Sequence, residues 1–356
     1  MTIPDVNQIG PASIGSGFKP FVIAEISANH GGNLQAALDL VDIAAKAGAS
    51  AVKLQHYRPE TITTRSNLPE FKVGGGTLWD GRQLFDLYEE AMTPWEWTSA
   101  IFNRASENGL VCFSSPFDTT AVDFLEEHNV VAYKVASFEL VDIPLIEYIA
   151  RTGKPMIMST GMATVQEIDN AVKAARDAGN TQLALLRCNS GYPADPQEMD
   201  LVAIPYMRER WECEVGLSDH TLDSTASIAA IALGATIIEK HIIAQRSDGG
   251  PDAAFSCEPD ELTKLIQQIN DAWSAIGTVR FGPSEREKAS IAFRRSLRVS
   301  STMRVGDVIL DSNVRSMRPA GGLPPIHIKD LIGRRVSQDL EVGAAITWDV
   351  ITDEII

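Results

Sequence analysis

The sequence of 356 residues is poor in cysteine and in positive charge. Its four cysteines stand far apart, with no CxxC pair among them: Cys112, Cys188, Cys213 and Cys257. This spacing excludes a zinc ribbon and a disulfide framework, and it favours free thiols in a cytoplasmic protein. Lysine and arginine number 31 against 47 aspartates and glutamates, a net charge of −16. Such an excess disfavours nucleic acids and anionic membrane surfaces as partners.

Long apolar runs and the commonest catalytic motifs are also missing. The longest apolar stretch, around residues 228–238, is too short to cross a bilayer. The first ten residues carry neither the basic nor the apolar region of a secretory signal, so we expect a cytoplasmic location. There is no Walker A motif, nucleophile elbow or HExxH, and no GxGxxG follows the first predicted strand. The usual sign of a dinucleotide-binding fold is therefore absent.

Eight short runs rich in β-branched residues alternate with segments of helical period. We predict strands over residues 21–26, 50–55, 110–115, 131–136, 155–160, 181–188, 213–218 and 235–241. Residues 34–47 are predicted to form a helix that ends at Gly48. This helix places Leu38, Val41 and Ala45 on one face. Eight strand–helix units predict an α/β fold of the (β/α)8 TIM-barrel type, with a doubly wound open sheet as the alternative.

The interval between the second and third strands is longer than one helix requires. It contains three consecutive glycines, at 74–76, and three tryptophans: Trp79, Trp95 and Trp97. Long segments of this kind are uncommon in compact domains unless they are functional. We therefore expect this interval to cover a substrate.

The last part of the chain differs in sequence pattern from the barrel, with short predicted strands, turns and little helical period. We assign residues 1–276 to the barrel, 277–290 to a linker and 291–356 to a small β-rich second domain. The second domain is locally basic, whereas the barrel is acidic. Opposite charge suggests contact between the two parts or between subunits.

Polar residues follow the predicted strands, where a TIM barrel places its catalytic groups. Lys53 and Lys134 lie within apolar runs, and an interior ammonium needs an anion to offset its desolvation. His220 and His241 end adjacent strands about 4.8 Å apart, with Glu239 close by. Two such imidazoles predict a divalent metal site with positions left for water and substrate.

Three serines stand at loop starts near the lysines: Ser137, Ser159 and Ser190. Their hydroxyls and the neighbouring backbone N–H groups are suited to a phosphate and a carboxylate. N-capping of the following helix is an equally good interpretation of Ser159.

Many motifs of the chain resemble the sialic acid synthase family in order and spacing. They are AEISANHGG, AVKLQ, SSPFD, YKVASFE, MSTGMAT, GLSDHT, IIEKH and GGPD. The segment RRSLRVSSTMRVGDVI resembles the start of that family's antifreeze-like (SAF) domain. The likeness covers residues 20–356 and implies a (β/α)8 barrel followed by a SAF domain.

The resemblance also implies an activity and a cofactor. Members of the family condense phosphoenolpyruvate with an open-chain amino-sugar aldehyde, giving a nine-carbon 2-keto acid and phosphate. It implies Mn²⁺ or Mg²⁺ on His220 and His241, and an arginine, Arg318, that enters the barrel mouth of the partner in a domain-swapped homodimer. It implies phosphoenolpyruvate contacts for Lys53, Lys134, Ser137, Ser159 and Ser190, and sugar contacts for Gln55, Tyr192 and Asp252. It implies catalytic roles for both lysines and for Glu25 and Glu239. One of these two glutamates would orient water or transfer a proton.

Two segments, residues 75–97 and 249–262, resemble the branch of the family that makes pseudaminic acid. The expected sugar is then a 2,4-diacetamido-2,4,6-trideoxy hexose. A sialic or legionaminic acid synthase is the nearest alternative. A non-catalytic carbohydrate-binding protein built on the antifreeze-like domain is an alternative of a different class.

Overall fold

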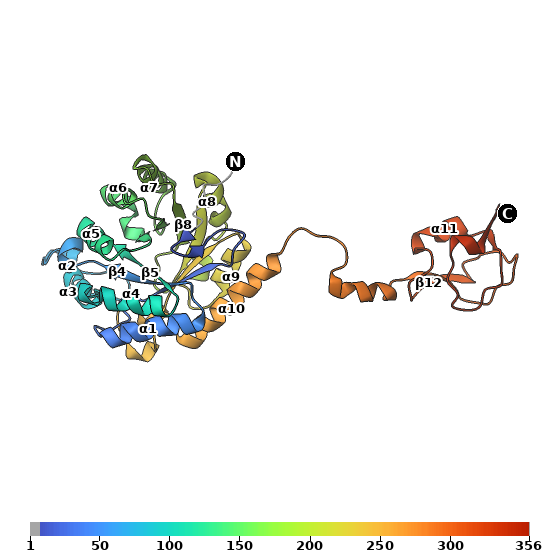
Figure 1. Ribbon diagram of the computed structural model, residues 1–356, viewed down its shortest axis with the longest axis horizontal. Coiled ribbons are helices and arrows are strands. Elements are labelled where there is room, and N and C mark those ends of the chain that lie inside the picture. Colours follow the sequence, from blue (N-terminus) through green and yellow to red (C-terminus); the bar gives the residue numbers. More distant parts are fainter. Residues whose placement is uncertain (1–7, 356) are drawn as a thin grey trace. The chain divides into compact units, whose positions relative to one another are not determined.

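The structure, a computed structural model, describes residues 8–355 of the chain. The chain divides into two compact units, residues 1–277 and 278–356, and each has its own hydrophobic core. Figure 1 shows both units and labels some of the helices and strands in each. Within the described residues, no helix is both long enough and apolar enough to cross a membrane.

The first unit is a closed barrel of eight parallel strands. The strands follow one another around the barrel in chain order, and β10 closes it by pairing with both β9 and β3. They are β3 (Phe21–Glu25), β4 (Ala51–His56), β5 (Val111–Pro116), β6 (Tyr133–Val135), β7 (Met156–Ser159), β8 (Leu183–Cys188), β9 (Glu214–Asp219) and β10 (Ile237–His241). The predicted barrel is confirmed, and the open sheet is excluded.

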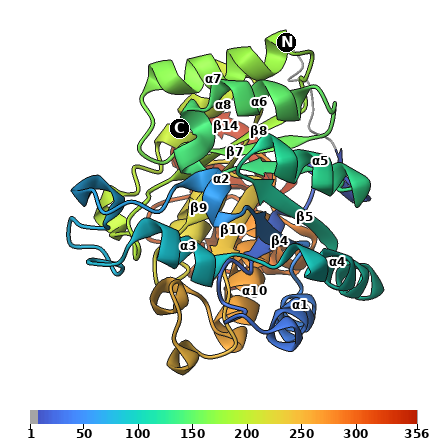
Figure 2. The ribbon, with the colours of Figure 1, turned by 90° about the vertical axis from the view of Figure 1, so that its left-hand side faces the viewer.

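Helices surround these strands, as Figure 2 shows. They are α1 (Leu34–Ala47), α4 (Thr98–Glu107), α5 (Thr119–Glu127), α6 (Ile143–Ala150), α7 (Val165–Asp177), α8 (Ala203–Trp211), α9 (Thr225–Ala232) and α10 (Pro259–Ile276). Short 3-10 turns lie in the loops at η3 (Ser137–Val141), η4 (Pro196–Glu198), η5 (Arg246–Asp248) and η6 (Ala253–Phe255).

Helix α1 has the predicted bounds, and the three residues predicted to share one face all contact the core. Gly48 adopts the left-handed conformation, with φ 87°, and its N–H bonds the carbonyls of the last turn. The buried residues are Ala37, Leu40, Val41, Ala44 and Ala47. Leu38 and Ala45 are partly buried at the edge of this stripe and pack against the same core. Small alanines face the barrel because α1 is also wedged between α4 and α10, which cover its flanks.

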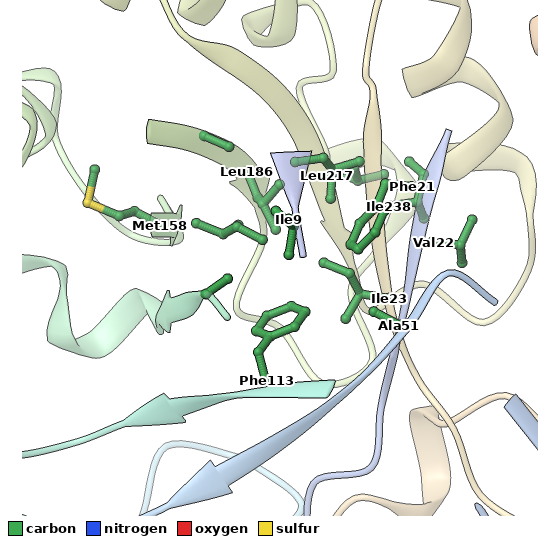
Figure 3. Packing of buried hydrophobic residues seen from close by; sticks show 14 of the residues in the cluster. Ile9, Phe21, Val22, Ile23, Ala51, Phe113, Met158, Leu186, Leu217 and Ile238 are labelled. Carbon is green, nitrogen blue, oxygen red and sulfur yellow. The ribbon is translucent and has the colours of Figure 1, made fainter. Parts of the chain in front are cut away.

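The N-terminal end of the barrel is filled by apolar side chains. A short hairpin, β1 (Gln8–Ile9) and β2 (Ala12–Ser13), carries Ile9 into the barrel. Figure 3 shows Ile9 among Ile23, Ala51, Phe113 and Leu186, which are all fully buried. This end is therefore a packed core, and it leaves the C-terminal end of the strands for polar chemistry.

The long interval after β4 is folded. It contains α2 (Pro59–Ile62), η1 (Pro69–Phe71), α3 (Leu84–Ala91) and η2 (Trp95–Trp97). Lys72 and Gln83 bridge its two arms, and the glycine run lies at the tip between them. Helices α2 and α3 pack against each other, so the segment is an ordered layer.

The second unit is β-rich, as predicted. It contains two antiparallel pairs, β11 (Ser296–Val299) with β12 (Val314–Met317) and β13 (Arg334–Val336) with β14 (Ile351–Ile355). Its short helical elements are η7 (Glu285–Phe293), η8 (Pro325–His327), α11 (Ile328–Leu331) and η9 (Trp348–Val350). Helix η7 crosses the limit that we set for the linker at residue 290. The missed signal is a capping box, in which Ser284 and Glu287 cap each other's backbone N–H groups.

Candidate active site

A cavity of about 400 Å³ lies at the C-terminal ends of the barrel strands, a volume typical of small-molecule sites. Most of the predicted site residues line it: Lys53, Gln55, Lys134, Ser137, Ser159, Tyr192, His220, Glu239, His241 and Asp252. The structure thus brings together side chains from β4, β6, β7 and β10, from η3, and from the loops after β8, β9 and β10.

Three predicted residues lie elsewhere. Glu25 is fully buried behind the cavity wall and forms an ion pair with Lys53. Ser190 packs beside Gly161, outside the lining itself. Arg318 is exposed in the second unit just after β12, and its contribution to the barrel stays a prediction.

The two interior lysines are balanced by carboxylates within the protein. The Nζ atoms of Lys53 and Lys134 lie 3.8 Å and 3.7 Å from the same oxygen, Oε1 of Glu239. Although burial opposes ionisation, Lys134 and Lys53 lower the pKa of Glu239, whereas burial raises the pKa of Glu25. Ser27 N and Gln55 Nε2 donate to the carboxylate of Glu25 at 2.9 Å and 3.3 Å. The lysines therefore already pair with a carboxylate of the protein. An anionic substrate that binds them would share the two ammonium groups with Glu239.

Two of the three predicted serines, Ser137 and Ser190, meet at Gly161, which lies two residues after Ser159 at the end of β7. The N–H of Gly161 donates to Ser137 Oγ at 3.1 Å. A Cβ at residue 161 would lie 2.7 Å from the same oxygen and would also collide with Ser190 Oγ. Only glycine therefore lets these hydroxyls approach the backbone so closely. Such a cluster of hydroxyls beside a backbone N–H suits a phosphate or a carboxylate.

The two histidines face each other, with ring centroids 5.3 Å apart. Nδ1 of His220 contacts the carbonyl of Asn189 at 2.8 Å. Because a carbonyl can only accept, Nδ1 of His220 carries a proton, which leaves Nε2 as the atom that could bind a metal. Although burial opposes it, the contacts with Cys188 and Asn189 raise the pKa of His220, so a metal would have to displace any proton on Nε2. Burial lowers the pKa of His241 well below its usual value, so that ring is neutral. Two imidazoles on one cavity wall fit a divalent ion.

Four buried polar atoms of the cavity lining have no hydrogen-bond partner among residues 8–355. They are Oγ of Ser159, Oε2 of Glu139, Oε2 of Glu239 and Nδ1 of His241. Unpartnered buried groups are costly and usually have a functional reason. The orphaned nitrogen of His241 supports the fit of a metal. Among the described residues, those of this cavity included, no group of three or more His, Cys, Asp or Glu side chains could hold a metal, so the protein would supply only the two imidazoles.

Glu139 has no assigned role in the sequence analysis, yet it shares this cavity. It lies in η3, where its carboxyl group interacts electrostatically with Lys134, Asp142 and Tyr88. Burial raises the pKa of Glu139 to about 7, despite the nearby Lys134. A carboxyl that titrates near neutral pH is suited to proton transfer. The signal available in the sequence was its position two residues after Ser137 at a strand end.

One wall of the cavity is apolar and comes from the interval after β4. Its lining side chains are Ile62, Val73, Leu84, Leu87, Tyr88 and Ala91. Trp79 joins this wall, stacks on Tyr192 with centroids 5.5 Å apart, and donates to the carbonyl of Pro251. The interval thus lines the cavity, as expected. Only Trp79 of the three tryptophans does so, because Trp95 packs on Phe124 and Trp97 on His30.

Comparison with known proteins assigns the chain to a family. A model of the NeuB family matches residues 40–281, and a model of the SAF domain matches residues 294–352. The chain belongs to the NeuB family. The predicted family is thereby confirmed, together with its two-part architecture.

Three relatives illustrate the spread of the NeuB family. The chain is 40% identical to a pseudaminic acid synthase of Campylobacter jejuni, over 92% of this chain and 95% of the relative. It is 38% identical to a pseudaminic acid synthase of Helicobacter pylori, over 93% and 97%. The crystal structure of an N-acetylneuraminic acid synthetase from Leptospira borgpetersenii, in complex with citrate, superimposes with a TM-score of 0.71 at 31% identity. That match covers 80% of this chain and 94% of the other.

Proposed function

We propose that this protein is a pseudaminic acid synthase. It condenses phosphoenolpyruvate with an open-chain 2,4-diacetamido-2,4,6-trideoxy hexose. A bond forms between C3 of phosphoenolpyruvate and the aldehyde carbon, water adds at C2, and phosphate leaves with the bridging oxygen by C–O cleavage. The observation that carries this proposal is the 40% identity to a pseudaminic acid synthase over nearly the whole chain, with an equipped cavity at the barrel mouth.

The polar half of the cavity has the groups that phosphoenolpyruvate requires. Lys53 and Lys134 supply two ammonium groups, and Ser137, Ser159 and the backbone at Gly161 supply neutral donors. We assign the phosphate and the carboxylate of phosphoenolpyruvate to these groups. The balance of each lysine by Glu25 or Glu239 keeps the site neutral without ligand, so binding does not have to overcome a large excess of either sign.

We assign the transfer of the proton and the orientation of the attacking water to the buried carboxyl groups. Glu239 is held as a carboxylate by the two lysines, and it is suited to orienting a water. Glu25 and Glu139 have raised pKa values and are suited to giving or taking a proton. Such pairs of carboxyl groups with opposite pKa shifts divide the acid and base roles.

We also propose a divalent cation on His220 and His241. Bound there, it would act as a Lewis acid toward the aldehyde oxygen of the sugar. Nitrogen ligands favour Mn²⁺ over Mg²⁺, which prefers oxygen. Tyr192 lies beside both the His220 ring, at 4.4 Å between centroids, and Trp79, so the sugar would reach the histidines along these aromatic faces.

The apolar wall favours a deoxygenated, acetylated sugar. The proposed substrate carries three methyl groups, one at C6 and two in its acetamido groups. Ile62, Leu84 and Leu87 offer apolar surface to such groups, and none of these three side chains has a hydrogen-bond donor for a 6-hydroxyl. A site without a partner for a hydroxyl disfavours the sugar that carries one.

We further propose a cytoplasmic homodimer in which the SAF domain of one subunit serves the barrel of its partner. Free cysteines suit a reducing compartment. Phe138, Val141 and Met162 are exposed apolar side chains on the loops after β6 and β7, next to the cavity. Exposed apolar groups of this kind mark contact surfaces.

Phosphate release tests the proposed activity. The protein is incubated with phosphoenolpyruvate, Mn²⁺ and each of three sugars: the precursors of pseudaminic and legionaminic acid and N-acetylmannosamine. We expect the fastest release with the first sugar and none above a no-sugar blank without it. Faster release with either of the other sugars would favour the alternative synthases, and sugar binding without any turnover would favour a carbohydrate-binding protein.

Mixing two inactive variants tests the swapped dimer. Arg318→Ala and His220→Ala should each be inactive, with Arg315→Ala as the control for loss of a nearby exposed arginine. In a swapped heterodimer, one barrel receives both an intact His220 and the partner subunit's intact arginine, so activity returns. No recovery after subunit exchange would mean that each barrel uses its own SAF domain, and an active Arg318→Ala variant would mean that it uses none.

A further inference from the structure

Behind the histidines, the outer faces of β9 and β10 carry a buried ion pair that no proposed catalytic step uses. Asp219 and Lys240 are register partners in the two strands, and their charged atoms lie 3.1 Å apart. The side chains are 0% and 1% exposed. Outer positions two residues earlier, Leu217 and Ile238, are apolar, so the charges appear only at the level of the site.

Every bond of Asp219 goes to the ion pair, to α9 or to the turn after His220. Its Oδ2 accepts from Ser227 Oγ of α9 at 2.6 Å. Its Oδ1 accepts from the N–H and the hydroxyl of Thr221 at 2.9 Å and 2.7 Å. Asp219 thus ties the residue that follows His220 to the helix layer.

Lys240 fastens the same turn from the neighbouring strand. Its Nζ donates to the carbonyl of Thr221 and lies 3.5 Å from the carbonyl of Asp223. All three ammonium donors are therefore directed to Asp219 or to this turn. The ion pair and the turn 221–223 form one bonded unit across β9 and β10.

The unit sits one residue before each proposed metal ligand. Asp219 precedes His220, and Lys240 precedes His241, while Ser218 and Glu239 face the cavity on the other side of the sheet. A metal site with only two protein ligands binds its ion weakly unless both are well placed. The distance between the two imidazoles therefore determines the affinity for the metal. Buried ion pairs add little to stability compared with apolar residues, which leaves positioning as the reason for this one.

We propose that Asp219 and Lys240 are positioning residues that set the separation of the His220 and His241 rings and thereby the affinity for the divalent cation. The inference rests on the metal site of the proposed function. Neither residue touches the cavity, so both act only through the histidines and the turn.

Mn²⁺ affinity of the full-length protein without substrates is the direct test, measured by calorimetry or electron paramagnetic resonance. The double variant Asp219→Leu/Lys240→Met keeps the site apolar and uncharged, which avoids an unpaired buried charge. We expect Mn²⁺ affinity to fall about 10–100-fold, a range typical of residues that orient metal ligands, while the unfolding midpoint stays near wild type. Ser227→Ala removes only the bond to α9 and should lower the affinity by a smaller factor.

A matched control breaks a partly buried ion pair between the same strand and α8. Glu214 starts β9 at the opposite end of the barrel and pairs with Arg208 at 3.2 Å. Glu214→Gln should lower stability and leave Mn²⁺ affinity unchanged. Unchanged affinity in the folded double variant and in Ser227→Ala would overturn the positioning role and leave the synthase proposal intact. A wild-type protein that binds no Mn²⁺ would overturn both the metal site and this inference.

Discussion

The two ends of the barrel differ sharply although the same strands build both. At the N-terminal end, Ile23, Phe113 and Leu186 surround Ile9 in an apolar layer. Two residues further along each strand, on the same face, stand Glu25, Ser115 and Cys188. The first layer is satisfied by packing alone, whereas the second contains ion pairs and unpartnered polar atoms. The difference separates stability from chemistry along a single strand.

This separation has a physical cost at the mouth. Buried charges and orphaned hydrogen-bond groups destabilise a fold, and proteins retain them where function requires it. Substitutions at the mouth should therefore change catalysis with little loss of stability. Substitutions at the packed end should do the reverse.

The largest effect is expected for His220→Ala. Loss of one of two imidazoles should remove the metal and lower kcat/KM about 10³-fold or more, because a charge-stabilising group at the reacting centre is lost. Circular dichroism and the unfolding midpoint should stay close to wild type. His327→Ala in the second unit is the control, and equal activity of the two variants would contradict the proposed role.

At the packed end, Phe113→Ala should destabilise the barrel by about 3–5 kcal/mol through the cavity that it leaves. Its kcat and KM should stay close to wild type below the unfolding temperature. Phe281, which is 94% exposed, provides the matched control, since Phe281→Ala should change stability by less than about 0.5 kcal/mol. Chemical unfolding and steady-state kinetics measure both quantities, and a large fall in kcat at full folding would break the comparison.

Glu139→Gln should sharpen the comparison through pH. Because burial raises the pKa of Glu139 to about 7 from an unfolded value near 4.5, the folded state binds the proton more tightly. Wild-type stability should therefore fall as the pH rises from about 4.5 to 7, by on the order of 3 kcal/mol at most. The variant stays neutral, so it should match wild type at pH 4 and be more stable at pH 8. Lys134, Asp142 and Tyr88 face this carboxyl and set the size of the effect.

Thermal unfolding at pH 4 and pH 8 measures this difference. Glu70→Gln, at an exposed position of the interval after β4, should show no such gain. A variant that is no more stable than wild type at pH 8 would mean that Glu139 is ionised without penalty.

The smallest effect is expected at the apolar wall. Leu84→Asn should lower the preference for the trideoxy sugar over N-acetylmannosamine about tenfold, within the range of about 1–3 kcal/mol that one apolar contact contributes to selectivity. The ratio of the two kcat/KM values measures it. Leu78→Asn, on the same interval but outside the cavity, should leave the ratio unchanged.

The sequence alone predicted those features that depend on local pattern. Alternating runs located all eight strands, and Gly48 marked the end of α1 correctly. The barrel rule then pointed to polar residues at strand ends, and most of them do line one cavity.

Features that depend on packing between distant segments were not predictable. Contacts with the flanking helices determine which face of α1 is buried. Trp95 and Trp97 pack against Phe124 and His30, respectively, and so do not line the cavity. The pairing of Lys53 with Glu25 and of Lys240 with Asp219 depends on the register of neighbouring strands. A lysine in an apolar run indicates that an anion is needed, but it does not say which one.

The most direct test of the proposed reaction at the barrel mouth uses phosphoenolpyruvate labelled with ¹⁸O in its bridging oxygen. Incubation with the pseudaminic acid precursor and Mn²⁺ should release labelled phosphate, one for each nine-carbon acid formed, and none when the sugar is omitted. Unlabelled phosphate, or no phosphate from the intact Mn²⁺-loaded protein, would contradict the account.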